Sequence, residues 1–487
     1  MIDVLELDLS LHPDDVAPLL RLPEIAKGGR RGRPCAVHIV WHDTPAAALA
    51  ADGLALAERR QGRETRWRLE RTRPLGSDVW APGTLPALVA EGDDPAELGQ
   101  PLPQPLLPIA AFEGQMRAVN GGAMTVSVLS GELRAVARAR PVCRVTLAGA
   151  AEAVAPFVHT NAQSLRLTVP AAVLAAEALG TARPPAAARR LGAPALPASL
   201  SVGEAFAFIV AHLADVILFH APKIRAGEAP EPVHQMRVAV RRLRSALKLF
   251  GKAVACPELE AATTELKALN GALGPARDWD VFTGSTVAAV ASTLPDDPGF
   301  ARLTGLARRR RDAAYAALGA YLDGPAFRQL CLSLATLAAA RPWERIAGDP
   351  TAEAESVDDL TRFATKALDR RFARLTARGE DIRELPATEL HVIRIDAKRL
   401  RYAAEFFAPL FPGRETRRFL RRLAALQERL GLLNDGAVAA GLLEEIGQAN
   451  GYAGGLVRGF IAAGSTDARD GIDRVWRKFV RRAIPGA

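Results

Sequence analysis

The feature that most constrains this chain is a sequence that occurs twice, at an offset of 157 residues. The segment HQMRVAVRRLRSALKLF, which starts at His234, matches HVIRIDAKRLRYAAEFF, which starts at His391. Without a gap, the same offset carries LGPARD at residues 273–278 onto LGLLND at residues 430–435. Chance rarely keeps register over so long a span. The sequence therefore predicts two similar helical halves that pack about a pseudo-twofold axis.

Each copy places its basic residues on one helix face. On a helical wheel that starts at His234, the basic residues recur at spacings of 3, 4, 3 and 4, and they are Arg237, Arg241, Arg244 and Lys248. The opposite side is apolar and carries Met236, Val240, Leu243, Leu247 and Phe250. The second copy repeats the basic stripe with His391, Arg394, Lys398 and Arg401, but Glu405 replaces Lys248. Arg242 and its counterpart Arg399 adjoin the two stripes.

A charged helix face is usually only solvated, but this one lacks the acids that such a face normally carries. No acid stands between His234 and Phe250, and like charges one turn apart destabilise a helix by a few tenths of a kcal/mol. A bound anion would explain the pattern. Arginine presents a planar fork of donors that matches phosphate oxygens. Cationic groups spaced by one helical turn, about 5.4 Å, would form a ladder for a repeated phosphate.

Nucleic acid is the natural competitor as a partner. Single-stranded nucleic acid would favour aromatic residues interleaved with the basic ones, and these helices offer Tyr402 besides the core-facing Phe250, Phe406 and Phe407. The arginine runs at 308–311 and 417–422 add positive charge, but no base-reading motif accompanies them. Nucleic acid therefore stays open as a partner but is not favoured.

Composition separates the chain into two parts. Residues 1–190 carry 21 Lys and Arg against 20 Asp and Glu, whereas residues 191–487 carry 42 against 34. The basic surplus thus belongs to the second part. The first part alternates like strands at Ala36–Trp41, Thr65–Leu69 and Met124–Val128, and an Ala/Pro-rich stretch at 182–198 is typical of a linker. No stretch of eighteen uninterrupted apolar residues occurs, so no membrane span is expected.

The duplicated motif resembles that of the CHAD family, the conserved-histidine α-helical domains. The resemblance covers roughly residues 198–487, and both copies also carry the later L-G-x-x-[RN]-D element. It implies two four-helix bundles related by a pseudo-twofold axis, with a basic cavity that binds inorganic polyphosphate. By motif position it implies ligand contacts at His234, Arg237, Arg241, Arg244, His391, Arg394, Lys398 and Arg401. Asp278 and Asp435 would be structural and hold neighbouring arginines.

The first part resembles a second family, the CYTH or triphosphate tunnel fold, at WHDTP (41–45) and DGLAL (52–56). That fold is a closed antiparallel β-tunnel that hydrolyses triphosphates with a divalent metal. Glu6 and Asp8 match two metal-binding acids of its first strand, but Ser10 replaces the lysine, and the late strand at 143–148 has no carboxylate. Arg59, Arg66 and Arg68 could still face inward. Because two acids make a thin metal site, the resemblance implies a degenerate tunnel, and Glu6 and Asp8 are only weak metal candidates.

The sequence thus predicts an α+β multidomain chain. A degenerate CYTH-like β-tunnel domain at 1–181 and the linker at 182–198 precede an all-α CHAD domain at 199–487, with repeats at about 199–345 and 356–487. The expected function is binding of inorganic polyphosphate at cytoplasmic polyphosphate granules, through the basic residues named above together with Arg242, Lys248 and Arg399. No cofactor is expected, although a divalent metal bound with the phosphate stays open. A metal-dependent triphosphatase or polyphosphatase that uses Glu6 and Asp8 is the enzymatic alternative.

Overall fold

The computed structural model describes the chain except for residues 1–3, 27–29, 74–79, 100, 121, 136–137, 183–191, 228, 295–296, 347–359, 380, 449–450 and 482–487. Most of the expected linker at 182–198 therefore lies outside the described residues. The chain forms two compact units. The first unit contains Met1–Gly192, Val210–Phe219 and Gly324–Ile346. The second contains Ala193–Ile209, His220–Asp323 and Ala347–Ala487.

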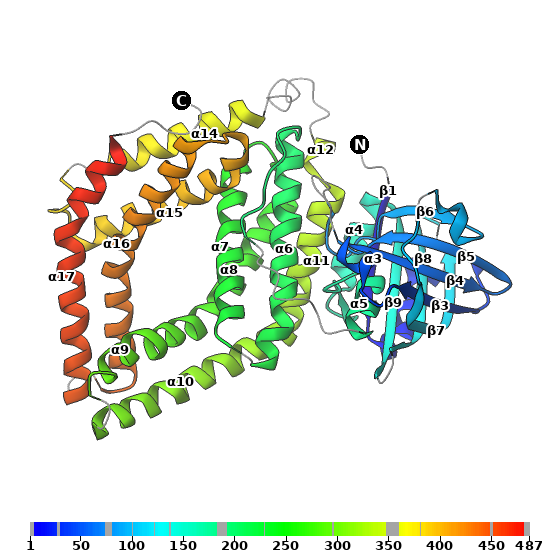
Figure 1. The fold of residues 1–487 in the computed structure, drawn as a ribbon, viewed down its shortest axis with the longest axis horizontal. Helices are drawn as coiled ribbons and strands as arrows, with labels where there is room; N and C mark the ends of the chain where they lie inside the picture. Colours follow the sequence, from blue (N-terminus) through cyan, green and yellow to red (C-terminus); the bar gives the residue numbers. More distant parts are fainter. Residues whose placement is uncertain are drawn as a thin grey trace. The chain divides into compact units, whose positions relative to one another are not determined.

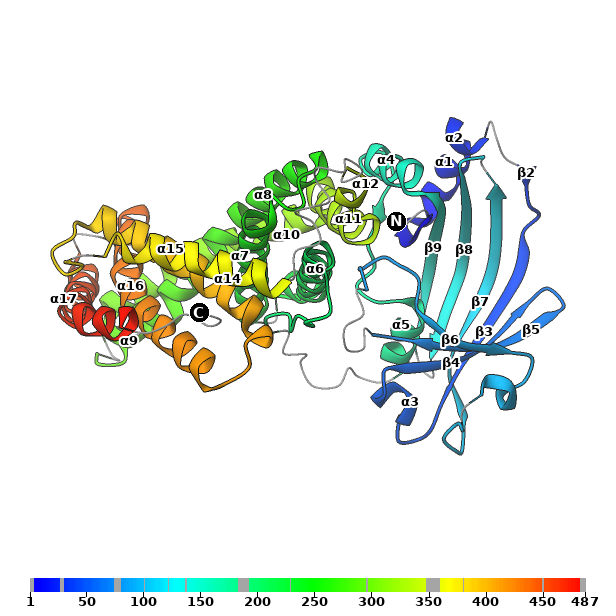
Figure 2. The same ribbon diagram turned by 90° about the horizontal axis from the view of Figure 1, so that it is seen from above.

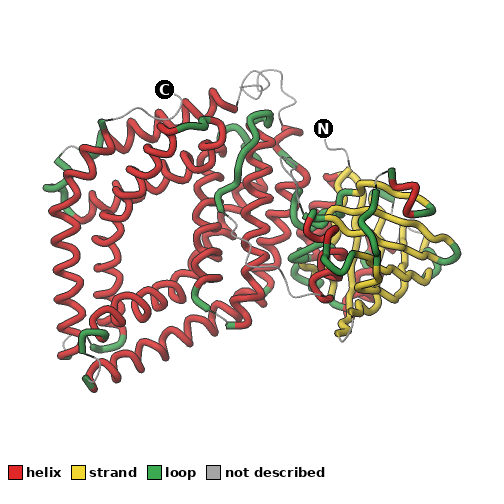
Figure 3. Tube along the Cα trace, viewed as in Figure 1, coloured by secondary structure: helices red, strands yellow, loops and turns green. Residues whose placement is uncertain are grey.

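An antiparallel sheet dominates the first unit, as the alternating segments predict (Figure 3). Its path runs β10-β1-β9-β8-β7-β3-β4-β5-β6, and β2 pairs with β7 outside this path. The strands are β1 (Val4–Leu11), β2 (Arg30–Arg31), β3 (Cys35–Asp43), β4 (Leu54–Gln61), β5 (Glu64–Arg71), β6 (Leu88–Gly92), β7 (Leu107–Asn120), β8 (Met124–Ala135), β9 (Arg138–Ala150) and β10 (Leu167–Thr168). Between the described residues of β6 and β10 no pairing closes the sheet.

The sheet is strongly curved. The long strands β9, β8, β7 and β3 run side by side, and β4, β5 and β6 cross their direction at a steep angle (Figure 2). On β3 every second side chain is buried, namely Val37, Ile39, Trp41 and Asp43, as a strand with one face toward a core requires. Phe112 of β7 and Leu133 of β8 complete this core, against which α5 (Leu174–Ala182) packs through Ala175 and Ala178.

Short helices complete the first unit. They are η1 (Pro13–Asp15), α1 (Val16–Arg21), α2 (Pro23–Ala26), α3 (Ala48–Ala51), η2 (Pro95–Leu98), α4 (Ala151–Asn161), α11 (Pro325–Ala340) and α12 (Trp343–Ile346). The WHDTP motif has a structural role here. The buried Asp43 carboxylate accepts hydrogen bonds from the backbone N–H groups of Thr44, Leu49 and Ala50, at 2.7, 3.0 and 3.2 Å. Asp43 thus ties the end of β3 to α3.

The second unit is helical, and its helices repeat at the offset found in the sequence. The first copy is α6 (Val202–Ala226), α7 (Glu231–Phe250), α8 (Pro257–Val281) with the π-helical turn η3 (Phe282–Val287) and α9 (Ala288–Ala291), and α10 (Pro298–Asp323). The second is α14 (Leu360–Thr376), α15 (Ala387–Phe407) with η4 (Ala408–Leu410), α16 (Arg414–Glu445) and α17 (Tyr452–Val480). The starts of α8 and α16, and the ends of α10 and α17, differ by the predicted 157 residues.

The helices start where the sequence supplies start signals. α6 begins with a complete capping box, in which the Ser201 hydroxyl and the Glu204 carboxylate each accept the other's backbone N–H. α8 has proline at its first position and acids in its first turn, at Glu258 and Glu260, which suits the positive end of the helix dipole. Local sequence therefore sets these boundaries.

Helices of one copy pack on their own counterparts, as a pseudo-twofold axis requires. α7 packs against α15, and α10 packs against α17 (Figure 1). Two pairs of equivalent phenylalanines, Phe206 with Phe363 and Phe250 with Phe407, meet beside the first of these contacts. The ring centroids of Phe250 and Phe407 are 6.0 Å apart, and Phe250 also lies 5.1 Å from Phe363 and 5.6 Å from Phe206. The two copies thus share one aromatic core.

One described helix, α6, is long and apolar enough to cross a membrane by length and composition, with a mean hydropathy of 1.9. Polar and charged residues, among them Glu204, His212 and Asp215, interrupt its apolar residues, so the helix contains no uninterrupted apolar stretch of eighteen. However, 67% of the eighteen-residue apolar segment of α6 is buried inside the structure, as is common for the core helix of a globular protein.

A candidate anion-binding site on the duplicated helices

Five cations from the two copies come together around α7 and α15. Arg237 and Arg241 lie on α7, Arg394 and Lys398 are their counterparts on α15, and Arg277 comes from α8. Each of the four stripe residues is half-buried. The opposite face of α7 is fully buried, with Met236, Val240 and Leu243 all 0% exposed. The helical wheel therefore assigned both faces of this helix correctly.

Two carboxylates accompany these cations, one from each copy. Arg237 Nη2 lies 3.5 Å from Asp278 Oδ1, and Arg394 Nη2 lies 3.7 Å from Asp435 Oδ1. The two ion pairs are equivalent at the offset of 157 residues. They confirm that Asp278 and Asp435 hold neighbouring arginines, and they explain why the later motif of each copy carries its aspartate.

The cations outnumber the carboxylates, and the imbalance lowers several pKa values. Burial lowers the pKa of Lys398 to about 8, and Arg394, Arg241 and Arg237 lower it further than Asp435 raises it. Burial, aided by neighbouring arginines, also lowers the pKa values of Arg237 and Arg394. These groups stay close together although both their desolvation and their mutual repulsion oppose the charge.

His234 shares this environment. Burial lowers its pKa, and Arg277, Arg241 and Arg237 act in the same direction. The lowered pKa favours the neutral imidazole, whereas a nearby negative charge would favour the protonated form. His391, the counterpart, is exposed.

Buried donors remain unsatisfied within this cluster. Arg237 Nη1, Arg241 Nε and Arg394 Nε are buried and have no hydrogen-bond partner among the described residues. Gly274, in the later motif, leaves room for Arg237, because a Cβ there would lie 3.3 Å from Arg237 Nη1. Buried N–H groups without acceptors are rare in folded proteins. Oxygen acceptors placed here would satisfy these donors.

The remaining predicted residues separate into two groups. Glu405 accepts Arg242 at 2.8 Å and Arg401 at 2.7 Å, so these two arginines are already paired. Their neighbourhood is thus not simply basic. The sequence predicted a break of the second stripe at Glu405, but not the ion pair with Arg242 across the two copies.

Arg244, Lys248 and Arg399 belong to a second basic cluster. Arg399 and Arg244 add to the burial that lowers the pKa of Lys248, and Arg399 pairs with Asp396 at 3.1 Å. The helix α14 contributes Arg371, whose pKa falls to about 10 through burial and through Arg370, Arg399 and Arg374. The sequence analysis missed Arg371 and Arg277. The spacing of three residues between Arg371 and Arg374, on one face of α14, was the available signal for Arg371.

The weak metal candidates are not brought together with further ligands. Glu6 is exposed, whereas Asp8 is 6% exposed and lies 3.4 Å from Arg144. Burial raises the pKa of Asp8 to about 6 against the effect of Arg144. Among the residues with described positions, no three His, Cys, Asp or Glu side chains are grouped to hold a metal ion.

Together, the duplicated helices and their cationic centre, formed by Arg237, Arg241, Arg277, Arg394 and Lys398, define a class of fold: a helical, internally repeated domain. The model of the CHAD domain matches residues 208–444. A crystal structure of the CHAD domain from the plant Ricinus communis is 33% identical, with a TM-score of 0.52, and the match covers 62% of this chain and 99% of that one. The chain therefore belongs to the CHAD family.

A second solved structure, PptA from Streptomyces chartreusis, is 18% identical with a TM-score of 0.42, and the match covers 57% of this chain and 100% of that one. None of the curated proteins matches the chain. The family match leaves the β-sheet outside its bounds. The likeness of that sheet to the CYTH fold therefore stays a prediction.

Proposed function

We propose that this protein binds inorganic polyphosphate through the cationic centre of its duplicated helices. The observation that carries the proposal is the set of unsatisfied guanidinium nitrogens on Arg237, Arg241 and Arg394. A linear polyphosphate offers closely spaced anionic oxygens, and each bond from arginine to such an oxygen is charge-assisted. Binding would satisfy the donors and relieve the repulsion that lowers the pKa of Lys398.

The second basic cluster extends the same proposal. Lys248, Arg399 and Arg371 continue the basic residues along α7 and α15 toward α14. A polyphosphate chain long enough to leave the centre would meet these residues next. We place the protein at cytoplasmic polyphosphate granules, where such chains are abundant, and expect long chains to bind more tightly than short ones.

The test is a salt titration of the affinity for long-chain polyphosphate. The variants Arg237→Ala/Arg241→Ala and Arg394→Ala/Lys398→Ala each remove two cations of the centre. We expect binding at least tenfold weaker in each, with a salt dependence shallower by about one to two released counterions. The matched control is Arg308→Ala/Arg309→Ala, which removes two exposed cations of α10 and should leave both quantities nearly unchanged.

Competition separates polyphosphate from nucleic acid. At moderate salt, polyphosphate should displace single-stranded DNA and RNA from the wild-type protein. If excess polyphosphate fails to displace them, or if the two centre variants bind like the α10 control, the proposal is wrong and the basic stripes are solvated faces.

A further inference from the structure

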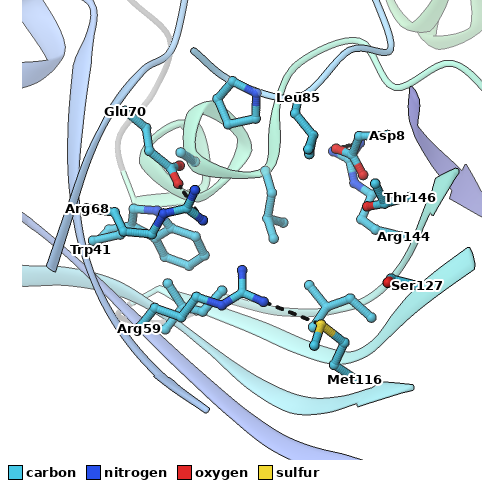
Figure 4. A pocket seen from close by; sticks show the side chains of 16 residues that line it. Asp8, Trp41, Arg59, Arg68, Glu70, Leu85, Met116, Ser127, Arg144 and Thr146 are labelled. Carbon is cyan, nitrogen blue, oxygen red and sulfur yellow. Dashed lines mark hydrogen bonds and ion pairs between the residues drawn. The ribbon is translucent and has the colours of Figure 1, made fainter. Parts of the chain in front are cut away.

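The β-sheet of the first unit encloses a cavity of about 150 Å³. Side chains from seven strands and from α5 line it, and most of its wall is apolar, with Ile39, Trp41, Leu85, Met116, Leu129 and Leu174 among the lining residues. Arg59, Arg68, Arg144, Asp8 and Glu70 add charge at its edges (Figure 4). A cavity of this volume admits a body of about the size of a benzene ring.

Two of the three arginines at this cavity are already neutralised. Arg144 lies 3.4 Å from Asp8 and 2.9 Å from Glu177, and it donates to the Ala172 carbonyl at 2.9 Å. Arg68 lies 3.4 Å from Glu70 and 3.6 Å from Glu91. Neither has a full positive charge left for a ligand.

Arg59 differs from the other two. Its printed partners are Gln61 Oε1 and Met116 Sδ, each 3.5 Å from Nη2, and no carboxylate within the described residues forms an ion pair with it. The guanidinium extends toward Met116 across the cavity (Figure 4). Burial and the neighbouring Arg68 lower the pKa of Arg59. A partly buried cation without a close anion costs free energy unless a ligand supplies one.

A second donor lacks an acceptor at the same wall. Trp41 is 2% exposed, and its Nε1–H has no hydrogen-bond partner within the described part of the chain. A buried indole N–H normally finds one. Arg59 and Trp41 stand on the neighbouring strands β4 and β3, where Ile39 pairs with Arg59 and Trp41 pairs with Ala57. The ladder thus places the two donors within two residues of each other.

We propose that this cavity binds a small organic monocarboxylate whose apolar body is about the size of a benzene ring. The carboxylate would accept from Arg59 and the body would fill the space between Trp41, Leu129 and Leu174. A ligand with several phosphates does not fit, because Arg59 is the one arginine without an ion pair among the described residues that line the cavity, and Asp8, Glu70 and Glu91 would repel further negative charge. The site is separate from the proposed polyphosphate site and does not depend on it.

Benzoate is the probe for the test, with the full-length chain and titration calorimetry or saturation-transfer NMR as the measurement. We expect saturable binding that weakens at least tenfold in Arg59→Gln. Arg59→Lys keeps a charge and should stay within a few-fold of wild type. The matched control is Arg60→Gln, because Arg60 neighbours Arg59 on β4 but is exposed; it should bind benzoate as wild type does.

Two further probes define the ligand class. Benzamide, which lacks the charge, should bind at least tenfold more weakly than benzoate. Tripolyphosphate, with or without Mg²⁺, should not displace benzoate. The inference is overturned if benzoate shows no saturable binding, if its affinity is the same in Arg59→Gln and wild type, or if tripolyphosphate displaces it. Arg237→Ala/Arg241→Ala should leave benzoate binding unchanged, so failure of either proposal is distinguishable from failure of the other.

Discussion

The two copies of the helical repeat are alike at their centre and different at one end. At the centre, Arg237 with Asp278 repeats as Arg394 with Asp435. At the end, Lys248 in the first copy corresponds to Glu405 in the second. Glu405 neutralises Arg242 and Arg401, whereas Lys248 lies near Arg399 and Arg244, and burial together with these two arginines lowers its pKa.

The same helices therefore serve two purposes, a cationic centre and a contact that holds α7 and α15 together. The centre keeps excess cations in both copies, which suits a bound anion. At the end, one acid fastens α15 to α7 through Arg242, while the equivalent position on α7 carries a further cation, Lys248, near Arg399 and Arg244. The asymmetry predicts that both copies contribute to folding through their aromatic core but contribute unequally to binding through their basic ends.

The largest expected effect tests the shared core. Phe250→Ala removes a ring that is 0% exposed and packs on three other phenylalanine rings. We expect a loss of about 3–5 kcal/mol in the free energy of unfolding, measured by urea denaturation. Phe407→Ala should cost somewhat less, because its ring lies near Phe250 and Phe363, at 6.0 and 6.2 Å. A cost below about 1 kcal/mol for both would contradict a common aromatic core.

The second prediction makes the ends of the two copies alike. Glu405→Lys leaves Arg242 without its partner, and the two side chains are only 15% and 14% exposed. We expect a loss of about 2–4 kcal/mol in unfolding free energy, together with a steeper salt dependence of polyphosphate binding. Glu405→Gln keeps an acceptor and should lose less stability. Unchanged stability in Glu405→Lys would show that the ion pair does not fasten the copies together.

How much the sequence could predict follows from this comparison. The period of apolar and basic residues assigned both faces of α7, and the offset assigned the counterparts, because both signals are local or repeated. The ion pair between Arg242 and Glu405 joins residues 163 positions apart and has no equivalent in the other copy. Neither the repeat nor the helical periodicity could therefore predict this ion pair.

The first unit gives the same lesson. The alternation at Ala36–Trp41 correctly predicted β3. The WHDTP motif contains Asp43, but the sequence did not show that its carboxylate caps α3. The sequence could not show that Asp8 forms an ion pair with Arg144 of β9, in which Arg144 Nη1 lies 3.4 Å from Asp8 Oδ2. Arg66 was grouped with Arg59 and Arg68, yet it pairs with Asp93 at 2.6 Å outside the cavity. Strand pairing and curvature, rather than residue type, decided which arginine faces the cavity.

The third prediction concerns Lys398, whose pKa burial lowers to about 8. Because the pKa of Lys398 is about 8 without ligand and a polyanion would raise it, binding above pH 8 requires uptake of a proton. Affinity for polyphosphate should therefore fall by up to about tenfold, or 1.4 kcal/mol, between pH 7 and pH 9.

Arg241, the counterpart of Lys398, supplies the control for this prediction. Lys398→Arg makes the two copies equal at this position and should abolish most of the decline, measured by titration at constant ionic strength. Both proteins keep His234, so the difference between Lys398→Arg and wild type isolates the contribution of Lys398. An equal decline in Lys398→Arg and wild type would exclude Lys398 as the titrating group.

The smallest expected effect comes from the reciprocal change at the other end. Lys248→Glu gives the first copy the acid of the second and offers Arg399 and Arg244 a partner. Because Lys248 is exposed, the gain in unfolding free energy should be only about 0.5 kcal/mol, while polyphosphate affinity falls by a few-fold through the lost cation. The control Lys252→Glu reverses an exposed charge just beyond the end of α7 and should leave affinity closer to wild type. If Lys248→Glu weakens binding no more than Lys252→Glu does, the basic end of α7 contributes only general positive charge. Specific binding of polyphosphate is then confined to the cationic centre.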